Sequence, residues 1–175
     1  MRMRDVTAAA MFAALTFVVT WYPLARIPIP ATKGYFNLGE VVIYLAAIVF
    51  GPAVGAFAGA VGSALADIAA AAPQYAVFTF LIKGIEGYLV GRLVGITAAS
   101  RLRATIVGGV WMVLGYFLAE VVFARVLGIA PTPATAVAAA LTEVPWNIVQ
   151  AAVGVVVAVS VAGRLRSAIT GQAVR

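Results

Sequence analysis

Long apolar stretches alternate along almost the whole chain with short segments rich in glycine, proline or charge. The stretches are of the length that crosses a bilayer as a helix. They predict six transmembrane helices, at about residues 5–22, 40–50, 53–72, 75–95, 104–124 and 134–163. The second is short, and the sixth is longer than a bilayer requires. We therefore expect an all-α integral membrane bundle that forms a single domain over residues 1–175.

The breaks between the stretches follow from residues that cannot sustain a helix. Proline and glycine make a loop of Pro23 to Asn37 and a tight turn of Gly51-Pro52. Ala72-Pro73-Gln74 and Arg125 to Pro133 are expected to be loops for the same reason. The first apolar stretch is not followed by a cleavage site and a polar mature domain, so it is interpreted as a transmembrane helix rather than a signal peptide.

Composition supports a membrane protein and excludes several kinds of chemistry. The chain is 64% hydrophobic and 10% charged, whereas soluble proteins average about 25% charged residues. It has no cysteine and no histidine, which argues against disulfides, thiolate or histidine metal sites and a Ser/His triad. No metal and no cofactor are expected. A phosphate-binding GxxxxGK[ST] run is absent from the sequence as well.

The basic residues are distributed unequally between the two ends of the predicted bundle. With six spans, the two termini and residues 92–103, an expected basic loop, lie on one side of the membrane. On the other side the basic residues are Arg26, Lys33 and Arg125. The positive-inside rule then places both termini in the cytoplasm. This asymmetry accounts for the net charge of +6 without a nucleic-acid partner. The basic residues on the side of the two termini are Arg2, Arg4, Arg92, Arg101, Arg103, Arg164, Arg166 and Arg175.

The fourth stretch contains Lys83 and Glu86, three positions apart and therefore on one helix face. Charges within a bilayer are expensive and face a bundle interior or a watery cavity. Two interpretations remain open: an ion pair that only stabilises helix packing, and a polar binding site. Counting about 1.5 Å per residue from the helix ends places most other polar residues of the spans in the outer half of the membrane. The candidate binding residues are Phe36, Asn37, Glu40, Asp67, Tyr75, Lys83, Glu86, Glu120, Glu143, Trp146, Asn147 and Gln150.

These residues indicate a cavity open to the outside. Glu143, Asn147 and Gln150 share one face of the last helix, and Trp146 lies beside them. A small molecule with a flat ring and several hydrogen-bonding groups suits this combination. Five carboxylates against one lysine cannot all be buried as anions, so some are protonated, hydrated or matched by the ligand.

The first helix carries alanines at the spacing that permits close helix contact. Ala9 and Ala13, like Ala10 and Ala14, lie one turn apart. Spacing alone leaves open whether these alanines pack within the chain or against a partner.

Four motifs follow one another along the chain: Tyr35-Phe36-Asn37-Leu38-Gly39-Glu40, Phe50-Gly51-Pro52 with Gly55, Gly62 to Asp67, and Lys83-Gly84-Ile85-Glu86-Gly87, followed in the last helix by Glu143, Pro145, Trp146, Asn147 and Gln150. Together they resemble the substrate-binding S components of energy-coupling factor (ECF) vitamin transporters, in the riboflavin-type branch. The resemblance covers essentially the whole chain, and in Glu40 the chain departs from the aspartate more usual in the family.

The resemblance implies a high-affinity vitamin binder in the cytoplasmic membrane of a prokaryote. Its partners would be a transmembrane scaffold protein and two ATPase subunits, and the first-helix alanines, Ala9, Ala10, Ala13 and Ala14, would dock on the scaffold. The cargo stays open among riboflavin, a thiamin precursor, pyridoxine-like compounds and cobalamin. The competing class is an intramembrane enzyme or a structural subunit. We expect no enzyme, because the chain lacks a recognisable metal cluster or activated nucleophile.

Overall fold

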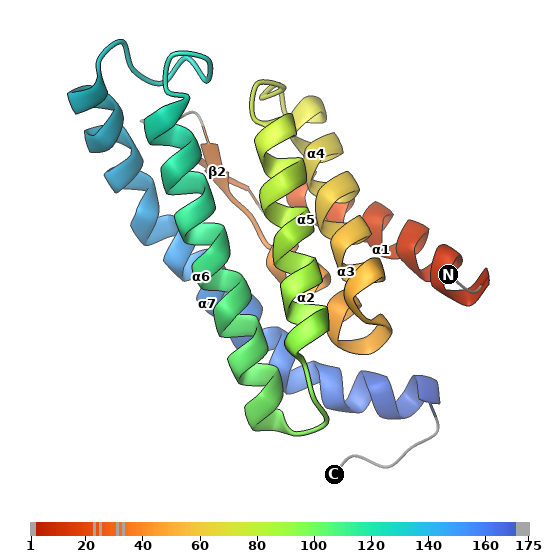
Figure 1. Cartoon of the computed structure of the whole chain (residues 1–175). Coiled ribbons are helices and arrows are strands. Elements are labelled where there is room, and N and C mark those ends of the chain that lie inside the picture. Colours follow the sequence, from red (N-terminus) through yellow and green to blue (C-terminus); the bar gives the residue numbers. More distant parts are fainter. Residues whose placement is uncertain (1–2, 23, 25, 31, 33, 171–175) are drawn as a thin grey trace.

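The structure is a computed structural model, and it describes residues 3–22, 24, 26–30, 32 and 34–170. Six helical segments form an elongated bundle (Figure 1), which confirms the predicted all-α architecture. Among the described residues, four are long and apolar enough to cross a membrane: Met3–Trp21, Pro52–Ala69, Ala98–Val122 and Pro133–Leu165. The helices are α1 (Met3–Trp21), α2 (Gly39–Phe50), the continuous α3–η2–α4 (Pro52–Phe57, Ala58–Gly62 and Ser63–Ala69), α5 (Ala76–Leu93), α6 (Ala98–Val122) and α7 (Pro133–Thr170).

The expected loop before α2 contains a small antiparallel hairpin. Strands β1 (Ile27–Ile29) and β2 (Gly34–Phe36) pair with Ile27 opposite Phe36. Pro28, which argues against a helix here, is compatible with a short edge strand. Viewed in Figure 1, the hairpin lies in the upper half of the bundle, between the α4–α5 pair and the α6–α7 pair. It is the feature that positions the candidate site.

Glycines allow the α3–η2–α4 segment to approach α5 with its backbone. A side chain at Gly59 would meet the carbonyl oxygen of Lys83, and one at Gly87 would meet the backbone of Gly55. In the centre of the segment, η2 is a single π-helical turn, a form common at functional sites. The close approach holds the α5 backbone at Lys83 directly against η2.

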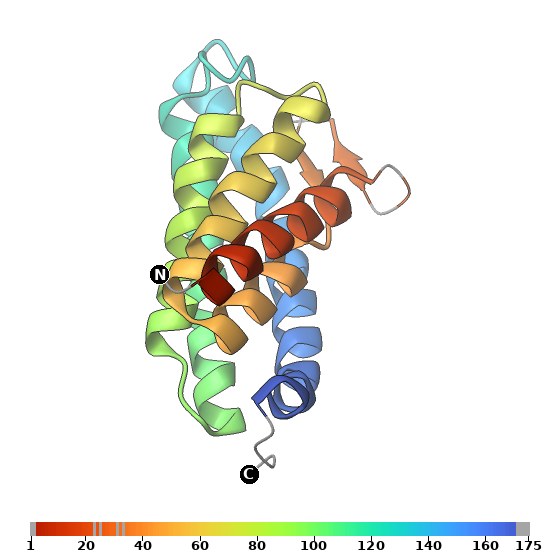
Figure 2. The same cartoon turned by 90° about the vertical axis from the view of Figure 1, so that its right-hand side faces the viewer.

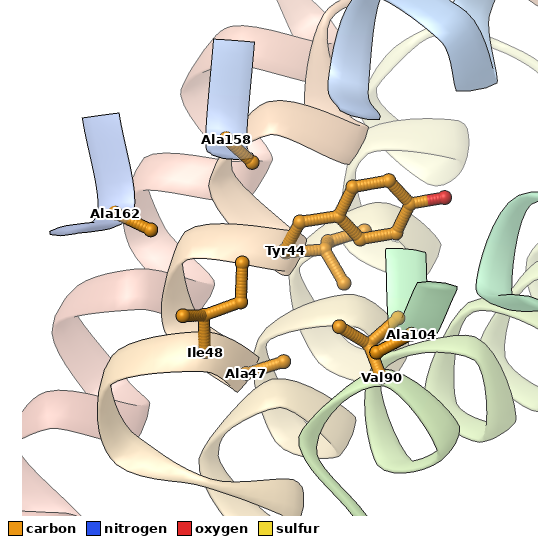
Figure 3. Packing of buried hydrophobic residues seen from close by; sticks show 8 residues of the cluster. Tyr44, Ala47, Ile48, Val90, Ala104, Ala158 and Ala162 are labelled. Carbon is orange, nitrogen blue, oxygen red and sulfur yellow. The ribbon is translucent and has the colours of Figure 1, made fainter. Parts of the chain in front are cut away.

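The core is built around α2. Tyr44 and Ile43 are fully buried and contact Val90 of α5, Ala104 of α6 and Ala158 of α7. Figure 3 shows how small alanines from α6 and α7 leave room for the Tyr44 ring. The short α2 thus lies inside the bundle, in the half that faces the ends of α7 and α5 (Figure 2).

Two helices extend into regions expected to be irregular. The prediction that residues 92–103 form a loop was wrong at its end, because α6 already begins at Ala98. Thr97 caps this helix by accepting a hydrogen bond from the Ser100 amide at 3.1 Å. Arg101 and Arg103 therefore lie on the first turns of α6. Likewise, α7 continues past Gly163 to Thr170, since arginines at a membrane surface do not interrupt a helix.

Candidate substrate-binding site

Lys83 is the centre of a buried ionic cluster. Its ammonium group pairs with Glu40 of α2 and, at 3.3 Å, with Oε2 of Glu86 one turn along α5. Tyr44 donates a hydrogen bond of 2.7 Å to the other oxygen of Glu86. The Lys83 nitrogen also lies 5.5 Å from the centre of the Tyr116 ring. The expected Lys83–Glu86 pair is thus present, but a second carboxylate from a different helix shares the lysine.

The hairpin is attached to α7 through three of the predicted binding residues. Thr32 donates a hydrogen bond to the carboxylate of Glu143. Gly34 packs directly on that carboxylate, since a side chain at Gly34 would meet Glu143 Oε1 at 2.7 Å. The backbone amide of Asn37 donates to Oε1 of Gln150 at 2.7 Å. One face of α7 therefore holds both ends of β2.

The opposite side of the hairpin is attached to α4 and to the segment before α5. Tyr35 donates a hydrogen bond of 2.6 Å to Asp67, and Tyr75 donates one of 2.6 Å to the Thr32 carbonyl oxygen. Burial and the neighbouring Asp67 carboxylate raise the pKa of Tyr35 well above its usual range. Tyr35 consequently remains a neutral donor at physiological pH, so this hydrogen bond persists.

The hairpin brings the predicted residues together in one half of the bundle. Ten of the twelve are buried; Phe36 is half-buried, and Trp146 is 41% exposed. These two rings form an edge-on pair with centres 6.4 Å apart. Trp146 therefore lies at the rim of the cluster rather than within it.

Several buried polar side chains form no hydrogen bond or ion pair among the described residues, including Thr16 and Thr20 of α1. Asn147 and Glu120 are the two that belong to the cluster. Asn147 is 6% exposed, and its side-chain amide makes no hydrogen bond with the described residues. Neither carboxyl oxygen of the fully buried Glu120 has a hydrogen-bond partner, although the carboxyl interacts electrostatically with that of Glu143. Buried polar groups are normally satisfied. The cluster thus has hydrogen-bonding capacity that the described chain does not use.

The sequence interpretation missed three polar side chains that complete the cluster. They are Thr32, Tyr44 and Thr79, whose hydroxyl accepts a hydrogen bond of 3.0 Å from Tyr116. Helical spacing held a signal for two of them, since Tyr44 follows Glu40 by four positions and Thr79 precedes Lys83 by four. Thr32 carried no such signal, because it reaches Glu143 across 111 positions of the chain.

A family model described as the ECF-type riboflavin transporter S component matches residues 1–167. The chain belongs to this family. S components are multi-pass proteins of the prokaryotic cell membrane, in agreement with the apolar helices described above.

Two proteins similar in sequence to this S component match it over about half of its length. A protein of Pyrococcus woesei described as uncharacterized is 55% identical over 95 residues, which cover 53% of this chain and 64% of that protein. The thiamine precursor transporter HmpT of Lactococcus lactis subsp. cremoris (strain MG1363) is 36% identical over 89 residues, 50% of this chain and 52% of HmpT. The matches thus span about half to two thirds of the relatives' length.

A solved structure has the same fold as this S component. It is described as the structure and mechanism of the S component of a bacterial ECF transporter. The TM-score is 0.73 at 19% identity, with 97% of this chain and 99% of that one covered. At this identity the likeness concerns the fold alone.

The four alanines of α1 in this S component do not share one environment. Ala9 and Ala13 are buried; Ala9 packs near Ala58, and the Ala13 carbonyl lies against Gly62. Ala10 and Ala14 are exposed on the other face. Internal packing accordingly accounts for Ala9 and Ala13, which leaves Ala10 and Ala14 accessible to a partner.

Proposed function

We propose that this chain is the membrane-embedded, high-affinity binding subunit for uptake of a small vitamin or vitamin precursor. The observation that carries this proposal is the side-chain amide of Asn147, a residue that is 6% exposed and makes no side-chain hydrogen bond among the described residues. It lies on the α7 face that also presents Glu143 and Gln150. A ligand with donor and acceptor groups would satisfy the amide, and leaving it unsatisfied has a free-energy cost.

The names of the family and of its relative support the class of cargo. The name of the family contains riboflavin, and the name of HmpT contains a thiamine precursor. Both compounds contain a flat, nitrogen-rich ring. Such a ring suits a site with an amide from Asn147 and aromatic edges from Phe36 and Trp146. The cargo of this chain is therefore a heteroaromatic vitamin or its precursor.

The hairpin controls access to the site in this proposal. Cargo enters from outside the cell and reaches Asn147 when the Thr32–Glu143 and Asn37–Gln150 hydrogen bonds open. A return to the arrangement described here would then enclose the cargo. The chain performs no catalysis; a transmembrane scaffold and two ATPase subunits supply the energy for release inside the cell.

The proposed orientation places both termini and the α5–α6 connection in the cytoplasm, with residues 1–175 as a single membrane domain. The arginines support it, because α5 ends, α6 begins and α7 ends at the same end of the bundle (Figure 1). These helix ends carry Arg92, Arg101, Arg103 and Arg164. The hairpin end of the bundle is then the outer one.

The first experiment is mass spectrometry of small molecules that co-purify with the protein in mild detergent, followed by calorimetric titration of the compound found. Asn147→Ala is expected to weaken its binding about ten-fold, the effect of one good hydrogen bond. Thr142→Ala is the matched control, since this exposed side chain on α7 bonds only to the Ala139 carbonyl. Unchanged affinity in Asn147→Ala, or no binding to any of a panel of vitamins, would contradict the proposal.

A further inference from the structure

An apolar groove runs along the outside of the bundle between α6 and α7. Its volume is about 480 Å³, and every residue that lines it is apolar. Its floor is where α6 and α7 come closest: a side chain at Gly109 would lie 2.9 Å from the Cβ atom of Ala151. The walls include Ile106, Val110 and Leu114 of α6 and Ile148, Ala152 and Val156 of α7.

The groove has the length of one lipid leaflet. Ile106 and Leu114 are eight residues apart, so the groove extends about 12 Å along α6. One leaflet of a bilayer contributes about half of the 30 Å hydrocarbon core. On α6 the groove begins at Ile106, eight residues after the start of the helix at Ala98, and ends at Leu114.

Arg103 lies on α6 about one turn before Ile106, the first residue of α6 that lines the groove. It precedes Ile106 by three positions and Val110 by seven, which places all three on one face of α6. The arginine is exposed and makes no hydrogen bond or ion pair with the described part of the chain. A cation without a partner in the described chain therefore lies next to one end of the apolar groove.

We propose that this groove binds an anionic phospholipid, with one acyl chain along α6 and α7 and the phosphate on Arg103. The apolar lining matches the chain, and basic residues beside transmembrane helices attract anionic head groups. An apolar helix from another protein would fill the groove but leave Arg103 unpaired. The proposal does not depend on the vitamin site, because no residue that lines the groove is a candidate binding residue.

The proposal is tested by native mass spectrometry of the purified protein with dioleoylphosphatidylglycerol or dioleoylphosphatidylcholine added. One phosphatidylglycerol is expected to remain bound at collision energies that remove phosphatidylcholine. Arg103→Gln should reduce phosphatidylglycerol retention about five-fold, the usual effect of one basic residue near an anionic surface. Arg92 is an exposed arginine at the same end of the bundle, on α5. Arg92→Gln should leave phosphatidylglycerol retention unchanged.

A second variant tests the groove itself. Ala152→Phe fills it from an exposed position on α7 and is expected to abolish specific retention. Ala138→Phe, also exposed on α7 but about 21 Å away along the helix, is the control. Equal retention of both lipids, or full retention in Arg103→Gln and Ala152→Phe, would overturn the proposal. A dimer that Ala152→Phe dissociates would overturn it too, by assigning the groove to a second copy of the chain.

Discussion

Lys83 is expected to contribute strongly to the stability of the folded protein. Lys83 is buried between the carboxylates of Glu40 and Glu86. Lys83→Met would leave both acids buried without a counter-charge, and breaking such a pair costs about 3–5 kcal/mol. We expect the free energy of unfolding in detergent to fall by about this amount, measured by titration with a denaturing detergent.

Glu40→Gln is the matched comparison for that lysine variant. It retains the Lys83–Glu86 pair at 3.3 Å, so a smaller loss of stability is expected. Wild-type stability in Lys83→Met would mean that the two acids are protonated in the folded protein. The same variant separates the two interpretations of Lys83: unchanged affinity for the cargo would leave it a packing residue only.

At the scale of the element, the contact between α3–η2–α4 and α5 depends on glycines with different surroundings. Gly87→Ala would place a methyl group against the Gly55 backbone, whereas Gly84→Ala would meet a side chain, the Cβ atom of Ala60, at 3.1 Å. Overpacking against backbone costs about 1–3 kcal/mol. We expect Gly87→Ala to lower the melting temperature clearly and Gly84→Ala to change it little, as measured by a thermal melt in detergent. Equal melting temperatures of the two variants would show that α5 can shift to accommodate the methyl group.

The elements differ in how far the sequence could predict them. The apolar helices follow from hydropathy, because a bilayer requires about 20 apolar residues for each crossing. The sequence does not predict the start of α6 at Ala98, because charged residues there indicate a loop, although Thr97 is a standard helix cap. The hairpin was missed because its three-residue strands contain a proline and depend on contacts to α4 and α7.

The candidate site was predictable in its residue types but not in its connections. Acids and amides within apolar helices are conspicuous, and Glu143, Asn147 and Gln150, which share one helix face, are all buried in the structure. The Lys83–Glu40 pair was not foreseen, since it joins residues 43 positions apart on different helices. Contacts of that kind depend on how the helices pack, which periodicity within one helix does not specify.

At the scale of the whole molecule, the surface of α1 is where assembly with a scaffold is expected. Ala10 and Ala14 are exposed one turn apart, so another helix can approach them closely. The double variant Ala10→Leu/Ala14→Leu should fold and bind cargo normally, yet lose co-purification with the scaffold and its ATPases. The measurement is an affinity pull-down of the co-expressed complex from detergent, scored by the amount of scaffold recovered for each tagged S component.

Two comparisons make this result specific to the exposed face of α1. Ala138→Leu adds the same bulk to an exposed position on α7 and should leave assembly intact. Ala9→Leu adds it to a position that is 3% exposed, so it should lower stability before it affects assembly, through overpacking against Val54 and Ala58. A stable Ala10→Leu/Ala14→Leu protein that still recovers the scaffold would place docking on another surface, because two leucines on adjacent turns prevent the close approach that small residues permit.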